Sequence, residues 1–546
     1  MEGLFKPTLQ CIQALNIDEF HSFTLMYPLE MSHDLWFPLY QEIKQQETHH
    51  MILESGRAGR YSVIGYRPVT HIVGKDGKLT YNELSKQGTV VSTKQEEGEL
   101  LDLLKAYTEG KKAYHFGEEG EISAGLFGYY SYDLVREIEE LPKQSTDDLH
   151  TPDVNLMEFE QLIVFDHTEN QHWLLLSQEL QELGSDQGEV ALQQTYEKAQ
   201  NKLLQWNEEL QSWIAQYENK KQNVKHEKSE EVDSQGVSYK GLSEVSAELP
   251  PLVPSLEEPA FVQAVEKIQQ YIAAGDVFQV NLSVRQARPL YGEPLDIYRH
   301  LRQINPSPYM GYLHFPEQQV ICGSPEQLIK LSGQKLSTRP IAGTRPRGGD
   351  REQDLKLAHE LIHHPKERAE HVMLVDLERN DLGKVAAFGT VHVDEFMVIE
   401  EYSHVMHIVS NVQGELAPEY DAFDVIRAVF PGGTITGAPK VRTMEIIEEL
   451  EPVRRGVYTG AIGWISFAGA MELNITIRTM LVQQEQVYVQ AGAGIVIDSV
   501  PQNEYQESLN KAKALWKAYE LSVTEWKQSE QSHKLEKSTE ETSLQV

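Results

Sequence analysis

The chain has 546 residues, 40% of them hydrophobic, and a formal net charge of -34 at neutral pH. This length exceeds one ordinary core, so two or three domains, or one large elaborated domain, are expected. The negative charge argues against nucleic acid and against an anionic membrane surface as partners. An anionic substrate would therefore need a local cationic pocket or a metal ion.

Two cysteines, Cys11 and Cys322, lie far apart and in no metal-binding or redox spacing. The first residues lack the pattern of a signal peptide, and no run of eighteen apolar residues is present. We expect a soluble, cytoplasmic protein without a membrane span. We also expect no nucleotide-binding fingerprint, no HExxH zinc site and no thiol for glutamine hydrolysis.

The first part of the chain, residues 1–217, is expected to form one N-terminal region. Residues 20–185 contain short β-rich runs separated by turns, including the hairpin signal KDGK, and predict an antiparallel sheet with helices on it. An amphipathic helix is expected over 188–217. Residues 218–259 are charged and then Pro-rich, which predicts a mobile linker.

Residues 260–522 are expected to form the catalytic domain. Strands and helices follow one another in runs, so α+β is favoured over doubly wound α/β. One long helix is predicted over 354–382, and a glycine turn over 492–494. Residues 523–546 are predicted to be a disordered tail.

Three side chains near the end of this region share a helical spacing. Glu504, Glu507 and Lys511 are three and four residues apart, so they lie on one face if the segment is helical. Two carboxylates and a cation there could hold a divalent ion beside an anionic ligand. The alternative is a surface helix with an ordinary ion pair.

Four further side chains are candidates for chemistry. Glu326 follows a turn and is either a general acid or a charge at a helix start. Glu370 lies in a helix that enters the core, and His407 lies on an apolar strand, where a histidine is more often a hydrogen-bonded core residue. Arg478 has the planar fork that pairs a carboxylate bidentately.

A small-residue loop precedes the next helix. Residues 431–440 read PGGTITGAPK and bring backbone donors and hydroxyls near a helix N-terminus. That arrangement suits a carboxylate or a phosphate.

Seven motifs in this order resemble the chorismate-utilising enzymes: SPEQL, PIAGTRPRG, EHVMLVDLERNDLG, SHVMHIVS, FPGGTITGAPK, ITIRTM and AGAGIVIDSVPQNEYQESLNKA. They cover roughly residues 260–520. ILESGRAGRYS and GLFGYYSYD in the N-terminal half are similar to the branch that contains anthranilate synthase component I and aminodeoxychorismate synthase component I. The resemblance implies an α+β fold of two large facing sheets with surrounding helices, and a buried chorismate site that needs Mg²⁺.

The resemblance also implies a role for each matching residue. The metal-binding acids would be Glu370, Glu504 and Glu507. The resemblance does not rank Glu504 against Glu507 as the direct contact to the metal. Glu326 would be the acid that assists loss of the ring hydroxyl, with His407 and Thr344 as the other catalytic residues. Contacts to the two substrate carboxylates would come from Thr434, Tyr458, Arg478, Gly492, Gly494 and Lys511.

The two enzymes of this branch are separated by a few positions. Asn281 and the Gly432-Gly433 pair resemble the aminodeoxychorismate branch. Ala342 in PIAGT points the other way, because many members of that branch carry a lysine there that attacks the ring. Gln327 is a further departure, since an arginine is usual after SPE.

The resemblance therefore favours conversion of chorismate and ammonia to 4-amino-4-deoxychorismate, in 4-aminobenzoate and folate synthesis. A separate glutamine amidotransferase subunit would supply the ammonia. The alternatives are anthranilate synthesis from the same substrate, towards tryptophan, and a catalytically inactive chorismate-binding scaffold.

Two more segments resemble the tryptophan pocket of anthranilate synthases. They are Leu53-Glu54-Ser55 and Asn305-Pro306-Ser307-Pro308-Tyr309-Met310. The alternative for the second segment is a rigid, proline-fixed turn. Whether tryptophan binds is left open.

Overall fold

The computed structural model describes residues 4–15, 19–55, 59–115, 122–180, 188–227, 249–402 and 405–543. Half of the predicted linker, residues 228–248, lies outside these ranges. Its first part, 218–227, continues the helix that precedes it.

The first of two large sheets has thirteen strands in the described chain. Their spatial order is β12 (Val253–Pro254), β13 (Gln279–Pro289), β25 (Gln486–Ile495), β24 (Thr479–Gln483), β15 (Gln318–Ser324), β14 (Tyr309–His314), β2 (His50–Ser55), β3 (Tyr61–Tyr66), β10 (Gln161–Asp166), β11 (Gln171–Glu179), β1 (Ser22–Leu29) and β7 (Ala113–Tyr114), with β21 (Gly437–Ala438) paired to β13.

The second sheet has twelve strands within the same ranges. Their order is β18 (Ile341–Pro346), β20 (Val405–Glu415), β17 (Lys335–Thr338), β16 (Gln327–Ser332), β23 (Met471–Ile475), β22 (Ala461–Ser466), β8 (Gly125–Tyr130), β9 (Val154–Phe159), β4 (Thr70–Lys75), β5 (Lys78–Leu84) and β6 (Val90–Glu97), with β19 (His392–Glu401) paired to β20.

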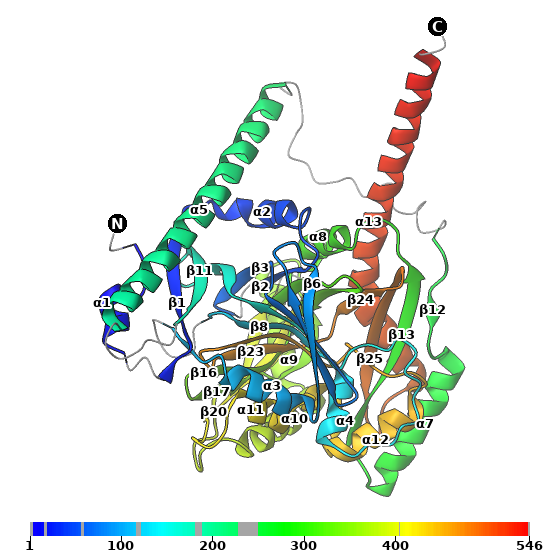
Figure 1. Ribbon diagram of the computed structural model, residues 1–546. Coiled ribbons are helices and arrows are strands. Elements are labelled where there is room, and N and C mark those ends of the chain that lie inside the picture. The colour runs from blue at the N-terminus through cyan, green and yellow to red at the C-terminus, as the bar shows by residue number, and fades with distance from the viewer. Residues whose placement is uncertain are drawn as a thin grey trace.

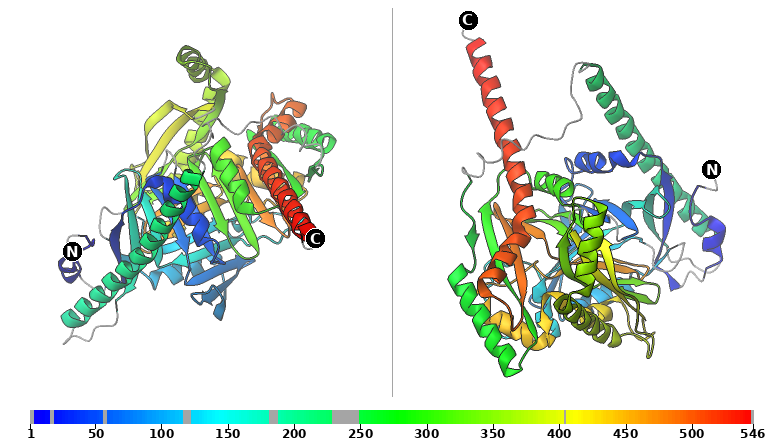
Figure 2. Two further views of the ribbon diagram at one scale, coloured as in Figure 1. Left: turned by 90° about the horizontal axis from the view of Figure 1, so that it is seen from above. Right: turned by 180° about the vertical axis from the view of Figure 1, so that it is seen from behind.

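Helices surround the two sheets (Figure 1). They are α1 (Leu9–Gln13), α2 (Trp36–Ile43), α3 (Leu100–Glu109), α4 (Val135–Ile138), α5 (Gly188–Glu227), α7 (Glu258–Ala274), α8 (Pro294–Ile304), α9 (Arg351–His363), α10 (Pro365–Gly383), α11 (Ala422–Val429), α12 (Lys440–Leu450) and α13 (Pro501–Ser543), with 3-10 turns η2 (His33–Leu35), η3 (Tyr132–Leu134) and η6 (Gly433–Ile435). The long helices α5 and α13 extend beyond the body on the same side (Figures 1 and 2).

Strand alternation divides the core into layers, because successive side chains of a strand point to opposite faces. In β2, Met51 packs in a cluster shared by both sheets, whereas Ile52 packs against α2, α5, α8 and α13. In β8, Phe127 joins the shared cluster and Leu126 packs with α3, α10 and α11. The order of layers is helices, sheet, sheet, helices, which confirms the predicted α+β fold of two facing sheets.

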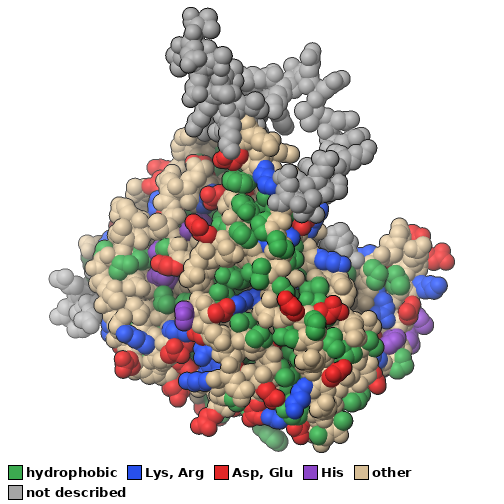
Figure 3. All heavy atoms as spheres, turned by 90° about the vertical axis from the view of Figure 1, so that its right-hand side faces the viewer, with side chains coloured by type: hydrophobic (Ala, Val, Ile, Leu, Met, Phe, Trp, Pro, Cys, Tyr) green, Lys and Arg blue, Asp and Glu red, His purple; other side chains and the backbone are tan. Residues whose placement is uncertain are grey.

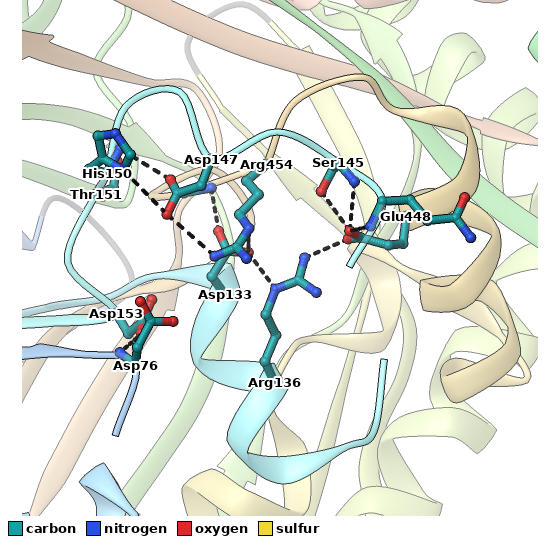
Figure 4. A network of polar contacts seen from close by, with 12 residues as sticks. Asp76, Asp133, Arg136, Ser145, Asp147, His150, Thr151, Asp153, Glu448 and Arg454 are labelled. Carbon is teal, nitrogen blue, oxygen red and sulfur yellow. Dashed lines mark hydrogen bonds and ion pairs between the residues drawn. The ribbon is translucent and has the colours of Figure 1, made fainter. Parts of the chain in front are cut away.

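Strands from both halves of the chain build both sheets. β14 pairs with β2, with Met310 opposite Glu54, and β22 pairs with β8. A polar network adds a second connection (Figure 4): Arg136 bonds Asp133 and Glu448, and Glu448 accepts from the amide and hydroxyl of Ser145. The regions 1–217 and 260–522 are therefore distinct in the sequence only. In the structure both contribute strands to the same two sheets and share one core.

Three local predictions differ from the structure. The predicted long helix is two, α9 and α10, because Pro365 begins the second and cannot donate an amide hydrogen bond. The predicted glycine turn at 492–494 lies inside β25. The tail expected to be disordered continues α13 through Ser543, in a stretch rich in good helix formers such as Glu, Lys and Gln.

No helix in the described ranges combines the length and apolarity needed to cross a lipid bilayer.

We predict that α13 is essential only up to Trp526. Trp526 packs against Tyr291, and Glu525 pairs with Arg299. Ending the chain at Gln531 should change the free energy of unfolding by less than about 0.5 kcal/mol, as for surface changes. Ending it at Asn510 removes the buried Leu515, Trp516, Tyr519 and Val523, each a loss of a few kcal/mol.

The measurement is urea unfolding followed by circular dichroism. A cooperative, full-amplitude transition in the Asn510 truncation would contradict this account.

Candidate functional site

The site is built where the chain crosses from one sheet to the other. β15 leads into β16 through Pro325 and Glu326, and β23 leads into β24 through Thr476 to Arg478. The two crossings bond each other: the amide of Ile475 donates to the carbonyl of Glu326 at 3.0 Å, and Gly323 donates to the carbonyl of Arg478 at 3.1 Å. Glu326 and Arg478 are thereby brought to the same place.

A cavity of about 760 Å³ opens beside these crossings. Every predicted catalytic, substrate-binding and metal-binding residue lines it: Glu326, Thr344, Glu370, His407, Thr434, Tyr458, Arg478, Gly492, Gly494, Glu504, Glu507 and Lys511. The structure shows that these residues meet, and their individual roles stay predictions.

Glu326 is a buried carboxyl group. Burial raises its pKa to about 7, although Thr434, the amide of Ile341 and the positive charge of Arg478 act in the opposite direction. Neither its Oε1 atom nor the Thr434 hydroxyl has a hydrogen-bond partner of good geometry in the described chain. Glu326 can therefore carry a proton at neutral pH and present it to a ligand, as a general acid requires.

His407 is oriented by an irregularity in the neighbouring strand. β18 has a bulge between Ala342 and Thr344, and Gly343 has a φ of 64° there. Nδ1 of His407 lies 3.0 Å from the Gly343 carbonyl and 3.1 Å from the Thr344 hydroxyl. A carbonyl only accepts, so Nδ1 carries the proton and Nε2 holds the lone pair. Burial lowers the pKa of His407 to about 4, so the ring is neutral.

Three basic residues, Lys366, Arg478 and Lys511, line the cavity of this acidic chain. Arg478 makes no ion pair with any residue that the structure describes, and burial lowers its pKa. Lys511 donates to the Gly492 carbonyl at 2.9 Å and pairs with Glu507 at 3.0 Å. Arg478 is thus available to a ligand carboxylate, and Lys511 is anchored at the cavity wall.

Carboxylates gather on the side of the cavity formed by α10 and α13. The pKa of Glu370 is raised by burial and by the charge of Glu367. The pKa of Glu504 is raised by burial and by Glu507. No group of three or more His, Cys, Asp and Glu forms a ready metal cage in the described ranges. Carboxylates whose pKa values are raised by acidic neighbours fit Mg²⁺, which is usually held by one or two carboxylates together with substrate and water.

The glycines of β25 are required by the neighbouring strand. A Cβ atom at Gly492 would lie 2.6 Å from Oδ1 of Asn281, and one at Gly494 would lie 2.4 Å from Nε2 of Gln279. Both side chains of β13 line the cavity. The glycines thus give room for amide side chains at the cavity wall, a role that the predicted turn did not anticipate.

The loop 431–440 contributes less than predicted. Thr434 and Ile435 line the cavity, but none of the described lining residues comes from α12, the helix that follows. Gly433 has a packing reason, since a Cβ there would lie 2.1 Å from Leu377 of α10.

A buried arginine that the sequence did not single out holds the wall together. Arg455 donates to the carbonyls of Asn281 at 2.7 Å and Ile435 at 3.1 Å, and pairs with Glu451 at 2.7 Å. Glu451 also accepts from the Ser283 amide and hydroxyl. Arg455 therefore connects β13 and η6 from behind the cavity. Arg454-Arg455 resembles a solvated charge pair in the sequence, so no local signal distinguishes it.

The segments predicted to form a tryptophan-type pocket lie on adjacent strands. Tyr309 is opposite Ser55, Met310 opposite Glu54, and Leu53 opposite Gly311. Glu54 pairs bidentately with Arg302, at 2.5 and 2.6 Å, and accepts from Tyr298 at 2.6 Å. Of the second segment, Asn305, Pro306, Ser307 and Pro308 line the large cavity. Whether a ligand binds at Glu54 stays a prediction.

The departure at Gln327 has a structural role. Its amide donates to the carbonyl of Ser337 at 2.8 Å and accepts from the Tyr309 hydroxyl at 3.1 Å, so it joins three strands.

Comparison with models of protein families identifies the family of this chain. The family model described as chorismate binding enzyme matches residues 48–517. The chain belongs to the chorismate-binding enzyme family. This confirms the family inferred from the motifs, and the match includes strands of both halves of this chorismate-binding enzyme.

Individual relatives agree. The chain is 48% identical over 494 residues to aminodeoxychorismate synthase component 1 of Bacillus subtilis, covering 90% of this chain and 96% of that protein. It is 41% identical over 485 residues to anthranilate synthase component 1 of Thermus thermophilus, covering 88% and 94%.

Solved structures share the fold. Anthranilate synthase component I of Streptococcus pneumoniae is 35% identical, with a TM-score of 0.64 over 85% of this chain and 93% of that one. The menaquinone-specific isochorismate synthase of Escherichia coli is 17% identical with a TM-score of 0.61 over 94% and 98%, which shows the fold alone.

We predict that Arg455→Met lowers the free energy of unfolding by about 3–5 kcal/mol, because it leaves the buried Glu451 without its counter-ion. The double variant Arg455→Met/Glu451→Gln should recover part of this loss. Urea unfolding of the two single variants and the double variant measures the coupling. Strictly additive losses would contradict a clamp formed by this pair.

Proposed function

We propose that this enzyme converts chorismate and ammonia to 4-amino-4-deoxychorismate, as the component that binds chorismate. The observation that carries the proposal is Glu326, a buried carboxyl whose pKa is raised to about 7, beside Arg478, which forms no ion pair with any described residue. Greater similarity to the Bacillus subtilis aminodeoxychorismate synthase component than to the Thermus thermophilus anthranilate synthase component supports this product over anthranilate.

Binding begins with charge. Chorismate carries two carboxylates. Repulsion between either one and an unscreened glutamate would cost a free energy on the order of kcal/mol, even at an effective dielectric of about 20. Arg478 offers a planar fork to one carboxylate, and Lys511, anchored to Gly492, offers a point charge. The hydroxyl of Thr434, a neighbour of Glu326, and the phenol of Tyr458 add donors.

Glu370, Glu504 and Glu507 would hold Mg²⁺, which when bound would neutralise substrate charge against these acids. The pKa of Glu370 is raised by burial and by Glu367, and that of Glu504 by burial and by Glu507, which supports this assignment for both.

The chemical step exchanges a hydroxyl for an amine. Glu326 gives its proton to the ring hydroxyl, whose C–O bond breaks so that water leaves. Ammonia forms the new C–N bond, and the proton that it sheds returns to Glu326. Neutral His407, with Nδ1 held by Gly343 and Thr344, keeps Nε2 as a hydrogen-bond acceptor for substrate or ammonia.

Ala342 lines the cavity at the position where a covalent lysine would stand. A methyl group has no nucleophilic atom, so we propose that ammonia attacks the ring directly. The ammonia would come from a glutamine amidotransferase partner. Cys322 does not support glutamine hydrolysis, because it is buried and burial raises its pKa.

Anthranilate synthesis is the second candidate, and Ala342 is the observation that favours it. The deciding experiment incubates the full chain with chorismate, Mg²⁺ and an ammonium salt. We expect a product that becomes 4-aminobenzoate only after a lyase is added, and loss of turnover in excess chelator. Fluorescent anthranilate formed without a lyase would overturn the proposal.

We predict that Glu326→Gln lowers kcat by about 10²–10⁴-fold, the usual contribution of a general acid. In the wild-type enzyme, kcat should fall as the pH rises through about 7, because the pKa of Glu326 is raised to about 7 and deprotonation removes the acid. A pH–rate profile checks this, and a variant with more than a tenth of the activity would remove Glu326 from this role.

The same substitution should affect stability with a defined sign. The folded-state pKa of Glu326 is above the ordinary carboxyl value, so its stabilising contribution is complete below about pH 4.5 and is lost as the pH rises through about 7. Glutamine does not titrate. Relative to wild type, Glu326→Gln should therefore gain roughly 2–3 kcal/mol between pH 4.5 and pH 8, measured by urea unfolding.

A further inference from the structure

The C-terminal part of α9 carries two exposed histidines, His359 and His363, of which His363 is in the last turn. The segment 359–363 reads HELIH, which is the HExxH pattern of zinc enzymes. The expectation that no such match occurs was therefore wrong. Residues four apart in a helix lie on the same side, so both imidazoles face one patch of solvent.

The geometry of the pair suits metal binding. The ring centroids are 4.0 Å apart and the ring planes are inclined by 27°. Nδ1 of His363 lies 2.7 Å from the carbonyl of His359. Because that oxygen only accepts, Nδ1 carries the proton and Nε2 is left with a lone pair. Metal-binding histidines commonly hold their second nitrogen on a carbonyl in this way.

The pair is not a protease site. Such a site needs a third protein ligand, and no group of three or more His, Cys, Asp and Glu is arranged for a metal in the part of the chain that the structure describes. α9 packs inward through the fully buried Leu361, against a cluster that includes Met406 and Ile408 of β20. The imidazoles lie on the opposite, outer side, so binding requires no change in the core.

We propose that His359 and His363 form a surface chelate for a borderline divalent transition-metal ion such as Zn²⁺, Ni²⁺ or Cu²⁺, with water completing the coordination. Imidazole nitrogens suit these ions, whereas Mg²⁺ prefers oxygen. The helix C-terminus, with its partial negative charge, favours a cation. Lys356, one turn before His359, opposes it and limits the affinity.

This site is separate from the proposed Mg²⁺ site. Neither histidine lines the large cavity. α9 nevertheless contacts β18, whose residues Ile341 to Thr344 form part of the cavity wall. A bound ion would also stabilise the folded chain by mass action, which gives a readout independent of catalysis.

The test is calorimetric titration of the full chain with Ni²⁺. We expect His359→Ala and His363→Ala each to weaken metal binding at least about tenfold. Even loss of a residue that only supports a metal ligand typically lowers metal affinity by about that factor. His392→Ala is the matched control, because His392 is also exposed and its Nδ1 lies 2.8 Å from a backbone carbonyl, that of Thr390. This control should bind as the wild type does.

Electron paramagnetic resonance of bound Cu²⁺ gives a second readout. The wild-type spectrum should show coupling to two imidazole nitrogens, and each single variant should lose it. Circular dichroism checks that the variants fold. Unchanged affinity in both variants, equal weakening in His392→Ala, or a two-nitrogen spectrum that survives His363→Ala would each overturn the proposal.

Discussion

The two crossings between the sheets determine the position of the catalytic site. The segments around Glu326 and Arg478 exchange backbone hydrogen bonds as they pass between the sheets, so a carboxyl and a guanidinium are fixed at one point of a closed interior. Burial there raises the pKa of Glu326 and lowers that of Arg478, which leaves both groups closer to their neutral forms than in water. Strand pairing, rather than a flexible loop, thus sets the chemistry of the site.

The overall charge of the chain does not describe its interior. The formal net charge is -34, and on the face shown in Figure 3 acidic side chains are interspersed with basic ones. In the cavity, Arg478, Lys366 and Lys511 lie in one lining with carboxylates on α10 and on the first turns of α13. Cations and carboxylates therefore line one cavity together, with Lys511 paired to Glu507 at 3.0 Å, and this local mixture of charge is not visible in the net charge.

Much of this could be predicted from the sequence. The spacing of Glu504, Glu507 and Lys511 fixed one helix face, and β-rich runs indicated the sheets. The bulge at Gly343, which aims His407, depends on pairing with a strand about sixty residues later, so local patterns could not indicate it. Arg455 owes its role to burial by segments from across the chain. The glycines of β25 were recognised as special, but their reason lies in side chains of β13.

The mixing of early and late strands in both sheets has a consequence for how the chain acquires its fold. β2 must wait for β14, and β8 for β22, before either central pairing exists. Such distant pairings require large loops to close first, and proteins dominated by them fold slowly. During synthesis the early strands are made long before their partners. Their apolar side chains and unpaired backbone edges are therefore exposed for that interval. The marked acidity of the chain gives those incomplete forms a mutual repulsion that opposes aggregation.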